Sequence, residues 1–168
     1  MSVDDLYQEV ILDHSRRPRN FGRLAAPDRT ASGDNPLCGD RIDLDLRLGG
    51  GRVEEVGFDG AGCAISTASA SLMTEAVKGR PLAEVDALYR RFHDLLTGGP
   101  GSGDRTEELG KLAALGGVRE YPMRVKCATL PWHTLRAALA APGVTVTTET
   151  EAATETEPTE TEPTETLR

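Results

Sequence analysis

The strongest constraint on the fold is an alternating run near the middle of the chain, from Ile42 to Leu48. Its apolar and charged residues take turns in the order Ile42, Asp43, Leu44, Asp45, Leu46, Arg47, Leu48. Successive side chains of a strand point to opposite faces, so this run predicts a strand with one buried face. The glycines at 49–51 and a second run, Arg52 to Phe58, follow directly. Together the two runs predict a β-hairpin.

Helical periodicity surrounds the predicted hairpin. Apolar residues recur at intervals of three and four, as on one face of an amphipathic helix. The predicted helices cover residues 2–14, 64–78, 81–97, 104–115 and 130–141. Gly79 follows the second of these helices, where a glycine commonly ends a helix in the left-handed conformation.

Composition limits the classes of function. The formal charge is −8, but residues from Thr145 onward contribute −6 of it through seven Glu and one Arg, so the remainder is nearly neutral and indicates no nucleic-acid partner. Residues 142–168 are a Thr/Glu/Pro-rich stretch that we expect to form a disordered acidic tail. No apolar run is long enough for a membrane span, and the N-terminus does not look like a signal peptide. We therefore expect a cytoplasmic protein with no membrane partner.

The three cysteines indicate a metal site rather than disulfides, because an odd number of thiols in a reducing compartment makes a disulfide framework improbable. Cys38 and Asp40 are two positions apart, so in an extended segment both side chains point the same way. Thiolate and carboxylate are both ligands of zinc.

The hairpin brings a further thiol to the same place. The Cys38 segment enters the first predicted strand and the Cys63 segment leaves the second, so both lie at one end of the sheet. Cys63 precedes the helix predicted at 64, and Cys127 precedes the helix predicted at 130. Each cysteine alone is compatible with a small buried thiol. Their common position at the ends of elements favours a tetrahedral zinc site of Cys38, Asp40, Cys63 and Cys127.

Four segments of the chain resemble the IscU/NifU-type iron–sulfur assembly proteins, and most of all their SufU-type branch. The segments are 6–20, 35–40 (Asn-Pro-Leu-Cys-Gly-Asp), 60–66 (Gly-Ala-Gly-Cys-Ala-Ile-Ser) and 124–130 (Arg-Val-Lys-Cys-Ala-Thr-Leu). The resemblance covers about residues 1–141. It implies one domain of the α+β class and the SufE/NifU superfamily: a small, largely antiparallel sheet packed by helices, with a metal site at one end.

The resemblance also implies a function in iron–sulfur cluster biogenesis. Lys126 occupies the position where the cluster scaffolds carry a histidine, and the region 98–117 fits an insertion typical of the SufU-type branch. This branch implies a zinc-dependent sulfur acceptor for a SufS-type cysteine desulfurase, a pyridoxal phosphate enzyme, with downstream SUF components as recipients. Cys38 is the expected acceptor because its glycine- and proline-flanked segment is the best placed to move. Arg124 and Lys126 are candidates for stabilising a thiolate or persulfide, or are ordinary solvated charges.

Two other functions fit the same residues. One is a scaffold that holds Fe²⁺ or assembles a [2Fe–2S] cluster on these ligands. The other is a zinc-stabilised structural or regulatory module without sulfur transfer. Metal content and persulfide formation distinguish the three.

Overall fold

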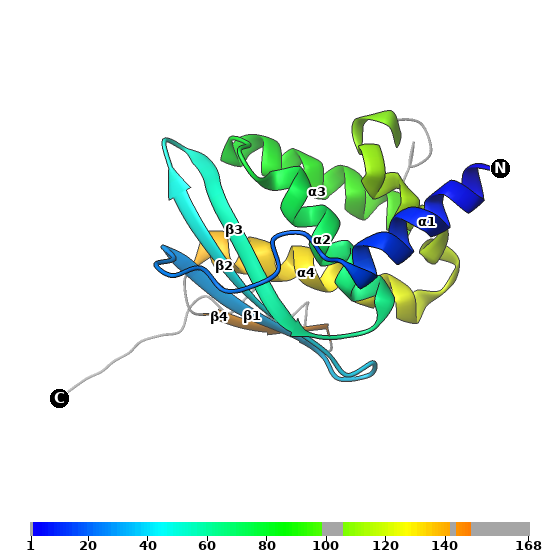
Figure 1. The fold of residues 1–168 in the computed structure, drawn as a ribbon, viewed down its shortest axis with the longest axis horizontal. Helices are drawn as coiled ribbons and strands as arrows, with labels where there is room; N and C mark the ends of the chain where they lie inside the picture. The colour runs from blue at the N-terminus through cyan, green and yellow to red at the C-terminus, as the bar shows by residue number, and fades with distance from the viewer. Residues whose placement is uncertain (1, 99–105, 142–143, 149–168) are drawn as a thin grey trace.

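The computed structural model describes residues 2–98, 106–141 and 144–148. The elements, in chain order, are α1 (Val3–Arg16), β1 (Arg29–Asn35), β2 (Asp40–Gly49), β3 (Arg52–Ala61), α2 (Ala64–Val77), α3 (Leu82–Thr97), the 3-10 helices η1 (Thr106–Glu108) and η2 (Gly110–Glu120), α4 (Pro122–Ala140) and β4 (Val144–Thr147). The strands form one sheet in the order β3-β2-β1-β4. Figure 1 shows α4 running across this sheet, with α1, α2 and α3 beside it, which is the expected α+β architecture.

The predicted hairpin is confirmed. β2 and β3 pair antiparallel from Arg41 opposite Ala61 to Gly49 opposite Arg52, with one irregularity at Arg47 and Leu48. Ile42, Leu44 and Leu46 are buried, as the alternation predicted. The start of β2 and the end of β3 therefore lie at the same end of the sheet.

The segment between α1 and β1 covers the other face of β2 and β3. The Gly22 N–H donates to the Phe58 carbonyl at 2.6 Å, and the Asp28 N–H donates to the Leu46 carbonyl at 2.8 Å. In Figure 1 this blue segment passes in front of β3 and β2 before it enters β1. It explains why Asp45, on the face opposite the apolar residues, is also fully buried: the Arg23 guanidinium donates two hydrogen bonds to its carboxylate, each of 2.8 Å.

Strand β1 was not expected from the sequence, because its residues are small or polar rather than alternately apolar. It forms by pairing antiparallel with β2 and parallel with β4. Its buried positions are Ala31, Gly33 and Asn35, which share one face of the strand. A side chain on Gly33 would collide with Thr134 and Leu130 of α4. The small residues of β1 therefore allow α4 to pack closely on the sheet.

The last predicted helix begins too late. The sequence indicated a start at 130, with Pro131 in the first turn, but α4 begins at Pro122 and Pro131 lies inside it. Pro122 occupies the first helical turn, where the missing N–H of proline removes no hydrogen bond. Pro131 has no N–H to offer the Cys127 carbonyl four residues earlier, yet packing against β1 and α2 retains the helix across it.

The expected boundary of the tail also needs correction. Val144–Thr147, assigned to the disordered residues 142–168, forms β4 and pairs with β1. The folded part of the chain therefore extends beyond 141. The rest of the predicted tail, 149–168, lies outside the described residues, as does the predicted helix start at 104.

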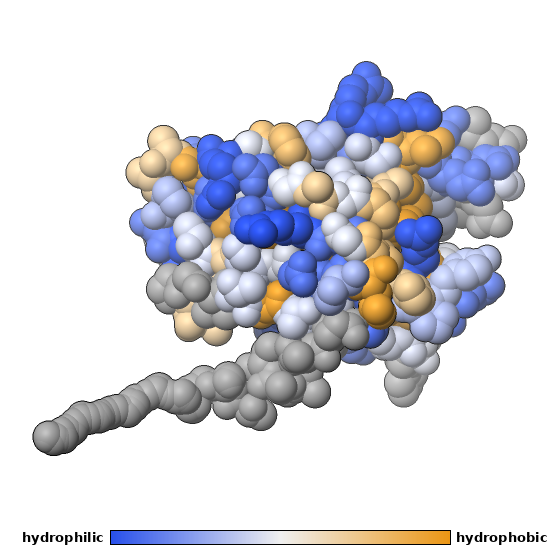
Figure 2. All heavy atoms as spheres, turned by 90° about the horizontal axis from the view of Figure 1, so that it is seen from below, coloured by the Kyte–Doolittle hydropathy of each residue, from blue (hydrophilic) through white to orange (hydrophobic). Residues whose placement is uncertain are grey.

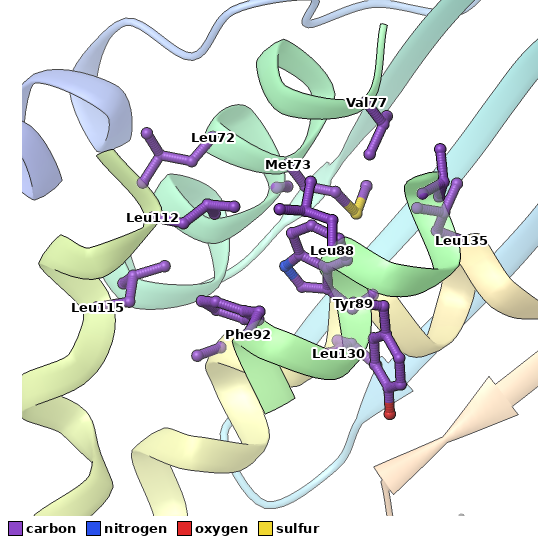
Figure 3. Close-up of a cluster of buried hydrophobic side chains, with 14 of the residues drawn as sticks. Leu72, Met73, Val77, Leu88, Tyr89, Phe92, Leu112, Leu115, Leu130 and Leu135 are labelled. Atoms are coloured by element: carbon purple, nitrogen blue, oxygen red, sulfur yellow. The ribbon is translucent and has the colours of Figure 1, made fainter. Parts of the chain in front are cut away.

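Helices α1, α2 and α3 agree with their predictions to within two residues at each end. Ser2 caps α1 through a capping box with Asp5, and Gly79 has a positive φ of 85° after α2. The predicted helix 104–115 is instead two 3-10 segments, η1 and η2. Figure 3 shows the core in which α2, α3, η2 and α4 meet, with Met73, Leu88 and Phe92 at its centre.

Within the described residues, no helix combines the length and apolar composition required to cross a membrane.

Candidate metal centre

Cys38 lies in the tight turn between β1 and β2. The Asn35 carbonyl accepts hydrogen bonds from the N–H groups of Cys38 at 3.2 Å and Gly39 at 2.9 Å. Gly39 has a φ of 74°, a conformation that favours glycine, and so allows the chain to reverse directly after Cys38. Asp40 then begins β2 and is fully buried. Cys38 is half-buried at the edge of the site.

Cys63 is the N-cap residue of α2, as its position before the predicted helix indicated. Its Sγ accepts the Ser66 N–H at 3.4 Å, and its backbone carbonyl accepts the Ser66 hydroxyl at 3.3 Å. The Cys63 sulfur therefore lies at the helix N-terminus, facing backbone N–H groups and the positive end of the helix dipole.

Cys127 does not precede a helix, contrary to the prediction, but lies in the second turn of α4. It is fully buried, on the side of α4 that packs against the sheet. Its Sγ is 3.3 Å from the Sγ of Cys38. The sequence therefore identified the residue but not the element that carries it.

Asp40 connects the two hairpin ends. Its Oδ1 accepts the Cys63 backbone N–H at 2.8 Å, and its Oδ2 lies 4.0 Å from the Cys63 Sγ. One carboxylate oxygen is thus used to fix the start of α2. The other faces the thiols and remains available as a ligand.

Three of the predicted ligands form a compact group. One ligand atom from each of Cys38, Asp40 and Cys127 lies within 4.8 Å of the other two, and among the described residues this is the group suited to a metal ion. Cys63 is outside that group, although its sulfur is close to Asp40. The structure brings all four predicted residues to one end of the sheet, with three of them in closer contact.

Asn35 is a member of the site that the sequence argument did not single out. It is fully buried on the face of β1 that carries Ala31 and Gly33. Its Nδ2 lies 3.4 Å from the Asp40 Oδ2 and 3.6 Å from the Cys127 Sγ. Its Oδ1 accepts a hydrogen bond of 3.0 Å from the Thr148 hydroxyl. Recognising β1 as a strand would have placed Asn35 on the same face as Gly33, under α4.

The pKa values of the buried Cys127 thiol and the exposed Arg124 guanidinium are both raised. Burial, together with hydrogen bonds to Asp40 and Cys38, raises the pKa of Cys127 far above its ordinary value. Electrostatic interaction with the Cys63 side chain, followed by a hydrogen bond with Cys127, raises the pKa of Arg124. Arg124 is exposed in the first turn of α4, one turn before Cys127. Lys126 directly precedes Cys127 in α4 and is half-buried.

Exposed apolar side chains lie next to the ligands along the chain. Leu37, directly before Cys38, is 54% exposed, and Tyr121 and Met123, at the start of α4, are 61% and 50% exposed. Figure 2 shows hydrophobic patches between hydrophilic ones on the right-hand part of the face seen from below. The rim of the site is therefore partly apolar.

Comparison with known proteins adds independent information. Residues 6–128 match the model of the family described as the NifU-like N terminal domain. The chain is 42% identical over 139 residues to the zinc-dependent sulfurtransferase SufU of Bacillus subtilis (strain 168), covering 83% of this chain and 92% of that protein. It is 39% identical over 137 residues to the iron–sulfur cluster assembly scaffold protein IscU of Streptococcus pyogenes serotype M1, covering 82% and 84%.

A solved structure gives the same result for the fold. The putative iron–sulfur cluster assembly scaffold protein for the SUF system of Fervidobacterium islandicum AW-1 superposes with a TM-score of 0.74 at 33% identity. The match covers 82% of this chain and 99% of that one. Both the fold and most of the chain length are shared.

Proposed function

Because the chain belongs to the NifU-like N-terminal domain family of iron–sulfur cluster assembly proteins, we propose that it is a zinc-dependent sulfurtransferase. In this proposal it accepts persulfide sulfur from a SufS-type cysteine desulfurase and passes it to cluster assembly. The observation that carries the proposal is the convergence of Cys38, Asp40 and Cys127 on one small volume. The zinc dependence stated in the name of the Bacillus subtilis relative supports it.

The donor atoms fit a zinc ion. Zinc–sulfur bonds of about 2.3 Å place two sulfurs of a tetrahedron about 3.8 Å apart, and the Cys38 and Cys127 sulfurs are 3.3 Å apart. A sulfur and a carboxylate oxygen on one zinc are about 3.5 Å apart, and Cys63 Sγ lies 4.0 Å from Asp40 Oδ2. These two separations are close to the tetrahedral values, and the Cys63 sulfur, outside the group of atoms within 4.8 Å of one another, has to move nearer to complete the site. We assign Cys38, Asp40, Cys63 and Cys127 as the ligands.

The four ligands have different tasks in the proposal. Zinc, when bound, keeps a coordinated thiol ionised at neutral pH without redox chemistry of its own. Cys63 and Cys127 are held by helices α2 and α4 and anchor the site. Cys38 is held only by a four-residue turn and is half-buried, so it can leave the site without disrupting a helix. Cys38 is therefore the sulfur acceptor.

The transfer step is a thiol exchange. The Cys38 thiolate attacks the terminal sulfur of the desulfurase persulfide, and the S–S bond of that persulfide breaks. The desulfurase cysteine leaves as a thiolate, and Cys38 carries the new persulfide with its proton. Atoms and electrons balance without an added oxidant or reductant. Arg124, whose guanidinium interacts with the cysteine sulfurs, is suited to stabilise the attacking Cys38 thiolate.

The desulfurase would bind over the apolar rim. Leu37 directly precedes the acceptor Cys38, and Met123 lies in the first turn of α4, the helix that carries Cys127. Both side chains are about half exposed. Serine at either position should raise the protein concentration needed for half-maximal stimulation of the desulfurase, without loss of bound zinc. The matched control is Leu12→Ser on α1, a leucine exposed to a similar degree, 44%, away from the ligands in sequence.

The alternative function is a scaffold that assembles a [2Fe–2S] cluster, and two of the related proteins are described as iron–sulfur cluster assembly scaffold proteins. Thiolates and a carboxylate can ligate iron as well as zinc. Anaerobic reconstitution with Fe²⁺ and sulfide distinguishes the two, because a scaffold gives a stable cluster spectrum and transfers the cluster to an apo-protein. Lys126 next to Cys127, in place of the histidine expected of a scaffold, favours the sulfur acceptor.

The decisive experiment measures metal and sulfur on the same sample. Protein purified without added metal should contain about one zinc per chain. After incubation with cysteine and a SufS-type desulfurase, mass spectrometry should find one extra sulfur on Cys38. Cys38→Ala should abolish that adduct and the stimulation of desulfurase turnover. Wild-type protein that stimulates no desulfurase would overturn the proposal and leave a zinc-stabilised module.

A further inference from the structure

We propose that Thr148 is a positioning residue of the metal centre, acting through the side-chain amide of Asn35. The inference rests on the ligand assignment above, because its effect is exerted on Asp40 and Cys127. Thr148 directly follows β4, in the part of the chain that the sequence assigned to the tail.

The sheet places Thr148 opposite Asn35. β4 and β1 run parallel, with Ala31 opposite Val144, Gly33 opposite Val146 and Asp34 opposite Thr147. One more step along both strands sets Thr148 beside Asn35, and the Thr148 hydroxyl donates to the Asn35 Oδ1 at 3.0 Å. Both residues are buried, Thr148 with 6% and Asn35 with 0% of its surface exposed.

This hydrogen bond decides which end of the amide faces the ligands. An asparagine side chain has one accepting oxygen and one donating NH₂ group. With the oxygen held by Thr148, the Nδ2 faces the Asp40 Oδ2 at 3.4 Å and the Cys127 Sγ at 3.6 Å. When zinc is bound, Asp40 is a carboxylate and Cys127 a thiolate, and both can only accept hydrogen bonds. A flipped amide would bring its oxygen against two anions.

The same contacts orient the two ligands. Asp40 has its Oδ1 committed to the Cys63 N–H, so the Asn35 amide is the further group that fixes the direction of Oδ2. Groups that hold metal ligands through hydrogen bonds commonly contribute about 10-fold to 100-fold in metal affinity. The chain Thr148–Asn35–Asp40/Cys127 meets that description and ties the last strand to the site.

Three substitutions in or directly after β4 test the inference. Thr148→Val keeps the size of the side chain and removes the hydroxyl, and Thr148→Ser keeps the hydroxyl and removes a methyl group. Thr145→Val is the control, because Thr145 is exposed on the same strand. Zinc affinity is measured by competition with a chromogenic chelator, and the Co²⁺-substituted protein gives an absorption spectrum that reports the ligand set.

Wild type and Thr148→Ser should bind zinc equally tightly. Thr148→Val should bind zinc about 10-fold more weakly and show altered Co²⁺ bands. Thr145→Val should match wild type. If Thr148 served only to form the strand, Thr148→Val should bind zinc more tightly than Thr148→Ser, because valine favours strands more than serine does. Equal zinc affinity and Co²⁺ spectra for Thr148→Val and wild type would overturn the inference. Wild-type protein without a thiolate–Co²⁺ spectrum would overturn the ligand assignment itself.

Discussion

The sulfur atoms of Cys38 and Cys127 lie 3.3 Å apart, although the two residues are 89 positions apart in the sequence. This separation is longer than a disulfide bond of about 2.05 Å, but it places the two sulfurs in direct contact. A bound zinc ion would hold both sulfurs as ligands and keep them from joining. Loss of the metal should therefore allow these two sulfurs to react with each other.

We expect the metal-free protein to form a Cys38–Cys127 disulfide under mild oxidation, and the zinc-loaded protein to resist it. Alkylation of free thiols followed by mass spectrometry should find only Cys63 labelled after oxidation without zinc. Cys38→Ser should prevent the disulfide, and Cys63→Ser should leave it intact. A Cys38–Cys63 disulfide as the main product would contradict the geometry described here.

Substitutions of Cys63 should separate helix capping from metal binding. In the metal-free protein, Cys63→Ser keeps a side-chain acceptor for the Ser66 N–H, whereas Cys63→Ala removes it. The alanine variant should be less stable than the serine variant by about 1 kcal/mol. Urea denaturation with a chelator present measures the difference. Both variants should lose zinc affinity to a similar degree, and equal stability of the two would argue against the capping contact.

Asp45 should make the fold sensitive to acid. Burial on its own would raise the pKa of Asp45, but hydrogen bonds from Arg23 and the Leu24 N–H hold it below the ordinary value of 3.8. The contribution to stability is therefore present above about pH 3.8 and is lost as the pH falls through the lower pKa of the folded state. Asp45→Asn should cost about 2 kcal/mol at pH 7, and the difference from wild type should shrink below pH 3.8.

The control for this prediction is an exposed pair on the same hairpin. Arg47 and Glu55 form an ion pair at 3.4 Å, with both side chains more than 40% exposed. Arg47→Ala should change the unfolding free energy by less than about 1 kcal/mol, whereas Arg23→Ala leaves a buried carboxylate unpaired. Similar effects of the two substitutions would show that the Asp45 pair does not stabilise the fold.

Gly33→Ala should destabilise the packing of α4 on the sheet. A Cβ at this position would collide with the Thr134 hydroxyl, and overpacking of this kind costs about 1–3 kcal/mol. The double substitution Gly33→Ala, Thr134→Ala should recover part of that loss, because it removes the colliding atom. Gly117→Ala, which meets open space, is the control, and thermal unfolding compares all of them.

The sequence was sufficient to predict the elements that have a clear period. The alternation of Ile42, Leu44 and Leu46 predicted β2, and the helical spacing of the apolar residues after Cys63 predicted α2. Strand β1 has no such alternation, because its small residues are selected by contact with α4 rather than by burial of large apolar groups. That contact joins residues a hundred positions apart, and a local pattern does not contain it.

The same limit explains the errors at the site. Pro131 is typical of a helix start, yet here the preceding residues from Pro122 already form the helix because they pack on the sheet. The short apolar segment at Val144–Val146 is followed by Glu-rich residues, and its pairing with β1 is decided by the strand that was missed. Asn35 and Thr148 could be connected only after both strands were known.

Strand β4 is synthesised after all the candidate ligands, and this has a consequence for metal loading during biosynthesis. All four candidate ligands leave the ribosome before β4, and the Thr148 hydroxyl follows every one of them. A nascent chain can therefore gather its thiols while the Asn35 amide still lacks the group that fixes its orientation. Correct metal loading would then belong to the finished polypeptide rather than to the growing one.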